Sequence, residues 1–175
     1  MKIQFYTHRP DPLHYGVRLM DKALSRPDVR LWLYAGPGRA TDLAGRLNKI
    51  APERVWPLLR AADWVLMPPD EAQAVLPRSR ILLLDALPDA SLPPWPPAPR
   101  NPADAPLLPV WLNLGWDETR PAAVQALLST CAARGVQRLL EVVGDAPAAL
   151  AAARQRWREY REAGHEIEHL VKDSA

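Results

Sequence analysis

The alternation of short apolar runs with helical patterns constrains this chain most. Apolar, β-rich runs occur at residues 3–6, 29–35, 64–67, 81–84, 110–114 and 138–143, and each is short enough to be a strand. Helical patterns lie between or after them at residues 12–24, 40–49, 121–133 and 151–164. Strands that alternate with helices predict an α/β protein, a three-layer fold with a mostly parallel sheet flanked by helices.

The length and composition predict one domain spanning residues 1–175. A chain of 175 residues with 48% apolar content can bury a substantial core. Residues 85–109 interrupt the pattern, because nine prolines fall between Pro88 and Pro109. We expect an extended surface loop with polyproline II character, since proline fits neither helices nor inner strands. A tolerated insertion is favoured over a ligand for a proline-binding module.

Charge and cysteine content limit the partners and the compartment. The net charge of +2 is small for a dedicated nucleic-acid binder, although the pI is 8.9. The single cysteine, Cys131, excludes a disulfide within the chain and favours a reducing compartment. The opening MKIQFYTH lacks the apolar stretch of a secretory signal, and no apolar run approaches about 20 residues. A soluble, cytoplasmic protein that does not enter membranes is therefore expected.

The last predicted helix, residues 151–164, has an unusual mixture of side chains. Four arginines and two aromatics fall within eight residues: Arg154, Arg156, Trp157, Arg158, Tyr160 and Arg161. Arg154, Trp157 and Arg161 share one face, which suits a ligand that is both acidic and apolar. Alternatively, Trp157 belongs to the core and the arginines form a solvated face paired with Glu159 and Glu162.

No other pattern in the sequence predicts a catalytic site. The turn at residues 36–41 follows a strand and opens a helix, as a phosphate loop does, but it lacks a third glycine and a Gly-Lys-Ser/Thr ending. A divergent Rossmann-type nucleotide-binding enzyme using this turn is the alternative hypothesis. The histidines show no zinc-binding spacing, and Cys131 lies in an alanine-rich helix typical of a buried thiol. We therefore expect a non-catalytic protein without metal or cofactor.

Three segments carry a resemblance to a known family. These are KIQFYTH at residues 2–8, WLNLG at residues 111–115, and RLLEVVGDAPAALAAARQRWREYREAGHEIEHL at residues 138–170. Together they resemble the chi subunit family of bacterial DNA polymerase III. The resemblance implies a Rossmann-like α/β fold without nucleotide chemistry. It also implies an accessory role in the clamp-loader assembly, in which chi pairs with the psi subunit on a surface away from the last helix. DNA would be reached indirectly.

The resemblance further implies a peptide site for the acidic, Phe-terminated tail of single-stranded DNA-binding protein. By the family motif, Arg154 would hold a tail carboxylate and Trp157 would flank the terminal ring. Arg161, Val143 and Trp56 complete the expected site, whereas Arg156 and Arg158 are expected to be a supporting field or ordinary surface. The family's Trp and Phe beside the pocket are replaced by Asn48 and Val55. Either Trp56 substitutes for the lost Phe, or tail binding is weakened.

Overall fold

The structure is a computed structural model that describes residues 1–34, 36, 39–50, 52, 56–75, 78–84, 86–87, 107–114, 117 and 119–171. Its strands are β1 (Lys2–Arg9), β2 (Val29–Tyr34), β3 (Leu58–Arg60), β4 (Ile81–Leu84), β5 (Leu108–Leu114), β6 (Arg138–Gly144) and β7 (Glu166–Val171). Its helices are α1 (Pro12–Leu24), α2 (Ala40–Ile50), α3 (Ala61–Leu66), α4 (Pro69–Val75), α5 (Pro121–Ala133) and α6 (Pro147–Glu162).

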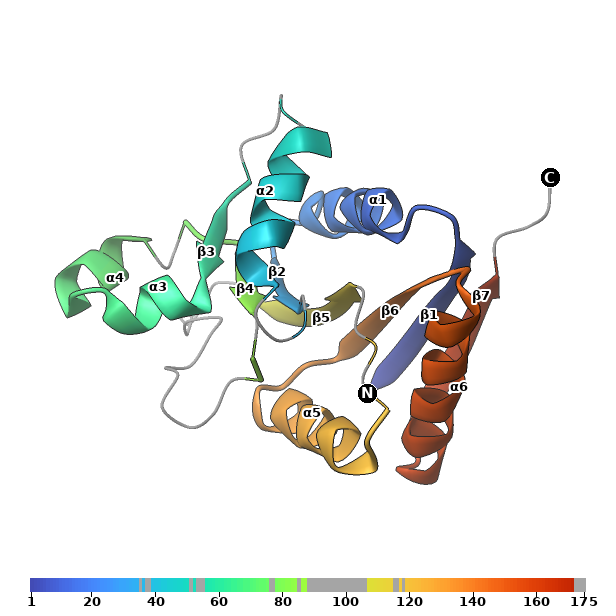
Figure 1. Cartoon of the computed structure of the whole chain (residues 1–175). Helices are drawn as coiled ribbons and strands as arrows, with labels where there is room; N and C mark the ends of the chain where they lie inside the picture. Colours follow the sequence, from blue (N-terminus) through green and yellow to red (C-terminus); the bar gives the residue numbers. More distant parts are fainter. Residues whose placement is uncertain are drawn as a thin grey trace.

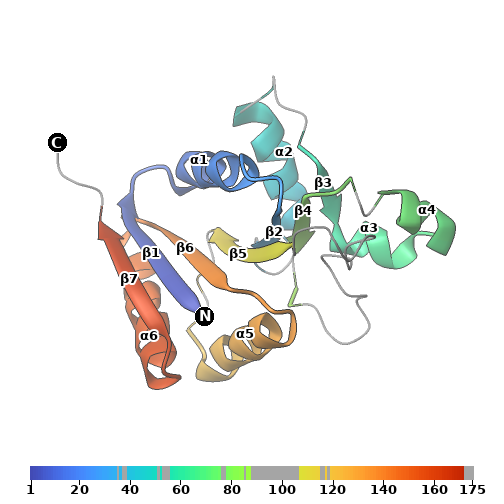
Figure 2. The same cartoon turned by 180° about the vertical axis from the view of Figure 1, so that it is seen from behind.

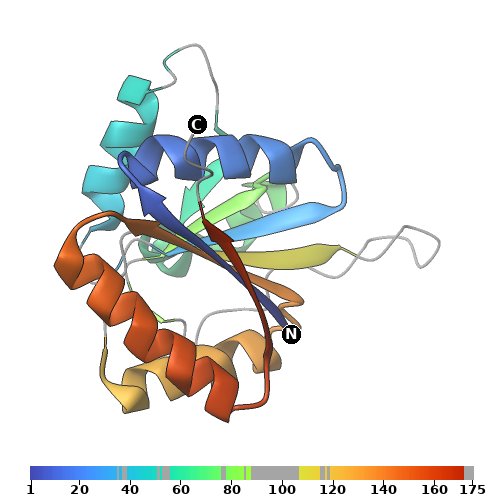
Figure 3. The same ribbon diagram turned by 90° about the vertical axis from the view of Figure 1, so that its right-hand side faces the viewer.

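The strands form one sheet in the order β3-β4-β2-β5-β6-β1-β7, and every neighbouring pair is parallel. Helices α1 and α2 cover one face, and α5 and α6 cover the other (Figures 1 and 3). The predicted three-layer α/β class is thus confirmed, with a described sheet that is entirely parallel. None of the described helices has the length and apolarity needed to cross a bilayer.

Two hydrophobic cores lie on the two faces of the sheet. In β2, Leu31 and Leu33 pack toward α1 and α2, whereas Trp32 and Tyr34 pack on the other face. This alternation follows from the two-residue period of a strand. All four residues of β4 are buried, as expected for a strand covered on both sides. The continuous ILLL run of the sequence is explained by this double burial.

The predicted helix α1 begins and ends where its sequence indicates. The Asp11 side chain accepts a hydrogen bond from the backbone N–H of His14 at 2.9 Å, and Pro12 occupies the first helical position. The buried positions Leu13, Val17 and Met20 recur every three or four residues and face the sheet. Local capping and periodicity therefore agree with the tertiary packing at this helix.

Residues 64–67 were expected to form a strand, and this prediction is wrong. Trp64 and Leu66 belong to α3, in which Trp64 is 4% exposed and Leu66 is 85% exposed. A four-residue apolar run does not distinguish a strand from a short helix by its periodicity. The short strand β3 and the helix α4 were not predicted.

Strand β5 begins at Leu108, two residues before the predicted strand at residues 110–114, and so includes the end of the proline-rich segment. Pro109 therefore lies inside a strand between β2 and β6, although the predicted loop extended to residue 109. Pro109 is the second residue of β5, where a missing N–H interrupts little of the ladder, and its carbonyl accepts from the Gln137 N–H at 3.3 Å. Residues 88–106, which carry most of the predicted loop, lie outside the described residues.

The connection from β6 through α6 to β7 places the last helix over β1. Strand β1 lies between β6 and β7 and pairs with both, and β7 forms the edge of the sheet (Figure 2). Phe5 of β1 consequently packs beneath α6, with its ring centroid 5.8 Å from that of Tyr160. The first and last strands of the chain, β1 and β7, thus lie side by side, as the views from both sides show (Figures 1 and 2).

Candidate functional site

Helix α6 extends from Pro147 to Glu162, so it begins four residues before the predicted start at residue 151. It buries Ala152, Ala153, Arg156 and Tyr160 against the sheet. Arg154, Arg158 and Arg161 are exposed, and Trp157 is partly buried. The helix thus turns one arginine inward and leaves the others at the surface.

A cavity of about 400 Å³ lies between α6, β1 and β7. It is lined by Phe5, Thr7, His8, Leu150, Ala153, Arg154, Trp157, Arg158 and His169. Its volume is within the usual range for sites that bind small ligands or single side chains. Because its walls come from both ends of the chain, only the folded protein contains it.

Aromatic rings form the floor of this cavity. The Trp157 ring lies 5.1 Å from that of Phe5, at an interplanar angle of 52°. The His169 ring meets Trp157 edge-on, at a centroid distance of 5.7 Å. Such tilted and edge-to-face packing favours a fixed ring orientation. The floor is therefore an apolar surface, and part of its Trp157 ring remains exposed to solvent.

The ionisable residues that line the cavity are Arg154, Arg158, His8 and His169, without a carboxylate among the lining residues. The Arg158 guanidinium donates to the Gln155 side chain at 3.3 Å. The Arg154 side chain makes no hydrogen bond or ion pair within the described part of the chain. A guanidinium without a protein partner beside an apolar floor is suited to a carboxylate ligand.

Two histidines meet at one hydroxyl on the strand side of the cavity. The Thr7 Oγ1 lies 2.8 Å from His169 Nε2 and 3.0 Å from His8 Nδ1. The spacing of the histidines in the sequence bears only on metal binding and does not reveal this arrangement. His8 and His169 are 161 positions apart, so no local pattern indicates their contact. Among the described residues, no group of three or more potential metal ligands gathers.

A buried polar cluster fastens α6 to strands β5 and β6 of the sheet. Arg156 binds Glu141 through Nε and Nη2, at 3.2 and 3.0 Å. The same carboxylate accepts from Tyr160 at 2.6 Å and from Asn113 at 3.0 Å. Burial opposes the charge of Arg156, but the Glu141 carboxylate more than offsets this and raises the pKa of the guanidinium. The expectation that Arg156 is surface or supporting field is wrong, because it is 1% exposed.

The structure brings together two of the five residues predicted for the peptide site. Arg154 and Trp157 line the cavity, whereas Arg161 is exposed on α6 and does not line it. Val143 is 3% exposed in the core on the α6 side of the sheet. Trp56 packs with the core on the opposite face, beside α1 and α2. Trp56 is therefore not brought to this cavity, and its expected contribution receives no geometric support.

The two positions where the chain departs from the family pattern also lie elsewhere. Asn48 is exposed on α2, on the other side of the sheet from α6, and Val55 lies outside the described residues. The turn at residues 36–41 is described in part. Its Thr41 hydroxyl accepts from Arg60 at 3.0 Å, and Arg39 pairs with Asp117 at 3.5 Å. These side chains are engaged within the protein.

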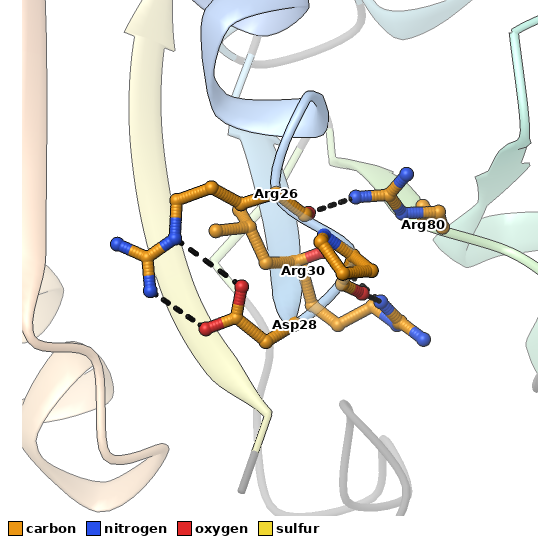
Figure 4. A network of polar contacts seen from close by, with 6 residues as sticks. Arg26, Asp28, Arg30 and Arg80 are labelled. Atoms are coloured by element: carbon orange, nitrogen blue, oxygen red, sulfur yellow. Dashed lines mark hydrogen bonds and ion pairs between the residues drawn. The ribbon is translucent and has the colours of Figure 1, made fainter. Parts of the chain in front are cut away.

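A second group of arginines lies at the amino end of β2 (Figure 4). Arg26 binds both carboxylate oxygens of Asp28, at 2.7 and 3.2 Å, and thereby lowers the pKa of Asp28. Arg80 donates to the Arg26 carbonyl. Arg30 donates to the backbone carbonyls of Pro27 and Val29. These contacts close the turn between α1 and β2.

Comparison with protein families agrees with the resemblance seen in the sequence. The model of the DNA polymerase III chi subunit, HolC, matches residues 93–168. The match includes the WLNLG segment and most of the C-terminal block, and it confirms the resemblance to the chi family over that range. It does not include the opening KIQFYTH, for which the resemblance remains a prediction. A search of curated proteins gives no match.

Comparison with solved structures concerns the fold alone. A structure of an S. cerevisiae Dbp5 variant bound to a Gle1 variant and IP6 aligns with a TM-score of 0.56 at 12% identity. The alignment covers 99% of this chain and 42% of that chain. This chain therefore spans less than half the length of the structure it resembles, and at this identity the likeness indicates only a shared α/β architecture.

Proposed function

We propose that this chain is an accessory, chi-type subunit of a bacterial DNA polymerase III holoenzyme, and that the α6 cavity binds the acidic C-terminal tail of single-stranded DNA-binding protein. The family match supports the subunit assignment. The observation that carries the peptide site is Arg154, which has no side-chain partner in the described chain and borders the partly buried Trp157.

The proposed binding combines charge and shape. Arg154 and Arg158, which are exposed at the rim of the cavity, would attract an acidic tail. Arg154 would hold a carboxylate in a bidentate contact. The terminal phenyl ring would lie on the floor formed by Trp157 and Phe5, which are 5.1 Å apart. Since the cavity holds about 400 Å³, it accommodates one aromatic side chain and its neighbouring backbone. Among the described residues, no carboxylate lines the cavity to repel the tail.

The rest of the proposal concerns the assembly. The subunit would act as a non-catalytic cytoplasmic adaptor that joins the clamp loader, through psi, to DNA coated by its binding protein. Psi would use a surface away from α6, so that both partners bind at once. Capture from native lysate on the wild-type chain tests this arrangement. Mass spectrometry of the captured proteins should identify psi and single-stranded DNA-binding protein. Recovery of neither partner would contradict it.

Calorimetric titration with an acidic peptide that ends in Phe tests the site directly. We expect Arg154→Ala and Trp157→Ala each to weaken binding about tenfold or more, because each removes one half of the recognition. Arg161→Ala is the matched control, since Arg161 is exposed on the same helix and does not line the cavity. Thermal melts establish that the variants fold. Unchanged affinity in both pocket variants would refute the site.

A further inference from the structure

Strand β1 contains a bulge where it passes the cavity. Tyr6 pairs with Val142 and Arg9 pairs with Gly144, so β1 advances three residues while β6 advances two. The extra residue falls within Thr7 and His8. His8 has a φ of 57°, and it is the one non-glycine residue of the described chain in the left-handed region. A side chain with a Cβ adopts this conformation at a cost, and such local strain tends to occur at functional sites.

The bulge changes the direction in which His8 points. In a regular strand, His8 would share a face with Tyr6, on the side of α1. Instead, it joins Phe5 and Thr7 in lining the cavity beneath α6. A β-bulge commonly redirects a side chain in this way. The bulge in β1 thus places the His8 imidazole in the same cavity as His169.

Thr7 holds both imidazoles by one ring nitrogen each. The hydroxyl contacts Nδ1 of His8 at 3.0 Å and Nε2 of His169 at 2.8 Å. A hydroxyl carries one proton and two lone pairs. It can donate to one neutral ring while accepting from the other, and it can accept from both rings when both are charged. The opposite nitrogens, His8 Nε2 and His169 Nδ1, have no hydrogen-bond partner in the described structure.

We propose that His8 and His169, oriented by Thr7, form a second anion-binding wall that holds a carboxylate of the bound acidic peptide and makes its capture pH-dependent. This inference rests on the proposed peptide site and extends it from the helix to the two strands. Arg154 and Arg158 border the cavity from α6, whereas the imidazoles border it from β1 and β7. An acidic ligand would be held from both sides.

Charged groups surround the imidazoles on three elements. From α6, Arg154 and Arg158 line the same cavity. On β7, the Glu168 carboxylate accepts from Gln4 at 2.7 Å and pairs with Lys2 at 3.1 Å. From β1, Arg9 donates to the Leu170 carbonyl at 3.1 Å and stacks over the Tyr15 ring.

A carboxylate of the ligand placed beside the imidazoles would favour their protonated form, so binding would take up protons and strengthen as the pH falls. Histidine is the side chain that changes charge between pH 5 and 8, whereas peptide carboxylates remain ionised there. We expect the affinity for an acidic, Phe-terminated peptide to rise about fivefold between pH 8 and pH 6, a coupling of ordinary size between linked sites.

Calorimetry at pH 6, 7 and 8, in buffers of different ionisation enthalpy, measures both the affinity and the protons taken up. The wild-type chain should take up protons on binding, and His8→Gln/His169→Gln should lose most of this uptake and of the pH dependence. His165→Gln is the control, because His165 precedes β7 and does not line the cavity. Thr7→Val should weaken binding at pH 6 while leaving both imidazoles in the chain.

The outcomes separate the two proposals. No peptide binding by the wild-type chain at any pH would refute the proposed site itself. Binding that depends on Arg154 but keeps its full pH dependence in His8→Gln/His169→Gln would refute this inference alone. NMR of the histidine rings in the wild-type chain gives an independent readout, which does not require a folded variant. If peptide binding shifts neither the His8 nor the His169 ring resonances, the inference is wrong.

Discussion

Arg156 and Glu141 form a two-point ion pair inside the protein, with 1% of each side chain exposed. The pair joins α6 to β6. Tyr160 and Asn113 complete the hydrogen bonding of the same carboxylate, at 2.6 and 3.0 Å. The surface arginines are thus carried by a helix whose position and rotation are fixed from below.

Breaking this pair should destabilise the fold severely. Arg156→Met leaves the Glu141 carboxylate buried without its counter-charge, and we expect a loss of about 3–5 kcal/mol in the free energy of unfolding. Urea denaturation followed by circular dichroism measures it. Arg156→Met/Glu141→Leu should recover part of the loss, since it removes the unpaired buried charge, whereas the Tyr160 hydroxyl and the Asn113 amide then lose their acceptor. A loss below about 1 kcal/mol in the single variant would contradict the role assigned to the pair.

Stability should fall in alkaline solution. Burial raises the pKa of the Tyr160 phenol well above its usual value, and the neighbouring Glu141 adds to the shift. Burial likewise raises the pKa of the Cys131 thiol. Both groups keep their protons in the folded state after the unfolded chain has lost them, so unfolding becomes easier as the pH rises.

Urea midpoints between pH 8 and pH 11 measure this effect. The decline should start near the ordinary thiol and phenol values of about 8.5 and 10. Cys131→Ala should remove the earlier part of the decline, and Tyr160→Phe the later part. A pH-independent midpoint over this interval would show that neither group is coupled to folding.

Gly16 of α1 and Gly45 of α2 offer a matched pair of substitutions. A Cβ at Gly16 would lie 2.7 Å from Leu114 Cδ1, so Gly16→Ala forces a core side chain to move and should cost about 1–3 kcal/mol. A Cβ at Gly45 of α2 meets nothing within 4 Å, and Gly45→Ala should stabilise by about 0.5–1 kcal/mol through helix propensity. Thermal melts of both variants test the opposite signs. Equal shifts would contradict the close approach of α1 to β5.

Removal of the α1 cap should have a smaller effect. Asp11→Ala loses the acceptor of the His14 N–H and should cost about 1 kcal/mol. Asp11→Asn retains an oxygen at the same place and should cost much less. Chemical denaturation of the two variants provides the comparison, and equal losses would indicate that the charge of Asp11, rather than its hydrogen bond, is what stabilises the helix.

Peptide binding should weaken as salt rises. The rim residues Arg154 and Arg158 are exposed, so their attraction to an acidic tail is screened over roughly 8–10 Å at physiological ionic strength. Titrations between about 50 and 300 mM salt should show a steady fall in affinity, with a shallower slope for Arg154→Ala. A salt-independent affinity would mean that the apolar floor alone binds the peptide.

Features that depend on neighbours along the chain could be predicted from the sequence. The period of Leu13, Val17 and Met20, the cap at Asp11 and the continuous run of β4 each reflect local geometry, and the structure agrees with them. The family motif also selected Arg154 and Trp157, both of which line the cavity. Where the local signal was short, as at residues 64–67, it did not distinguish a strand from a helix.

Features that depend on residues far apart in the chain were established only by the folded structure. The order of the parallel strands placed β1 between β6 and β7, and so brought Thr7 to His169. The packing also turned Arg156 inward, because Glu141 of β6 lies beneath Arg156 and binds its guanidinium. Spacing along α6 assigns a face to each arginine but does not reveal which face meets a buried carboxylate. Sequence carries the periodicity of each element, whereas the partners of its side chains are fixed only when the elements pack.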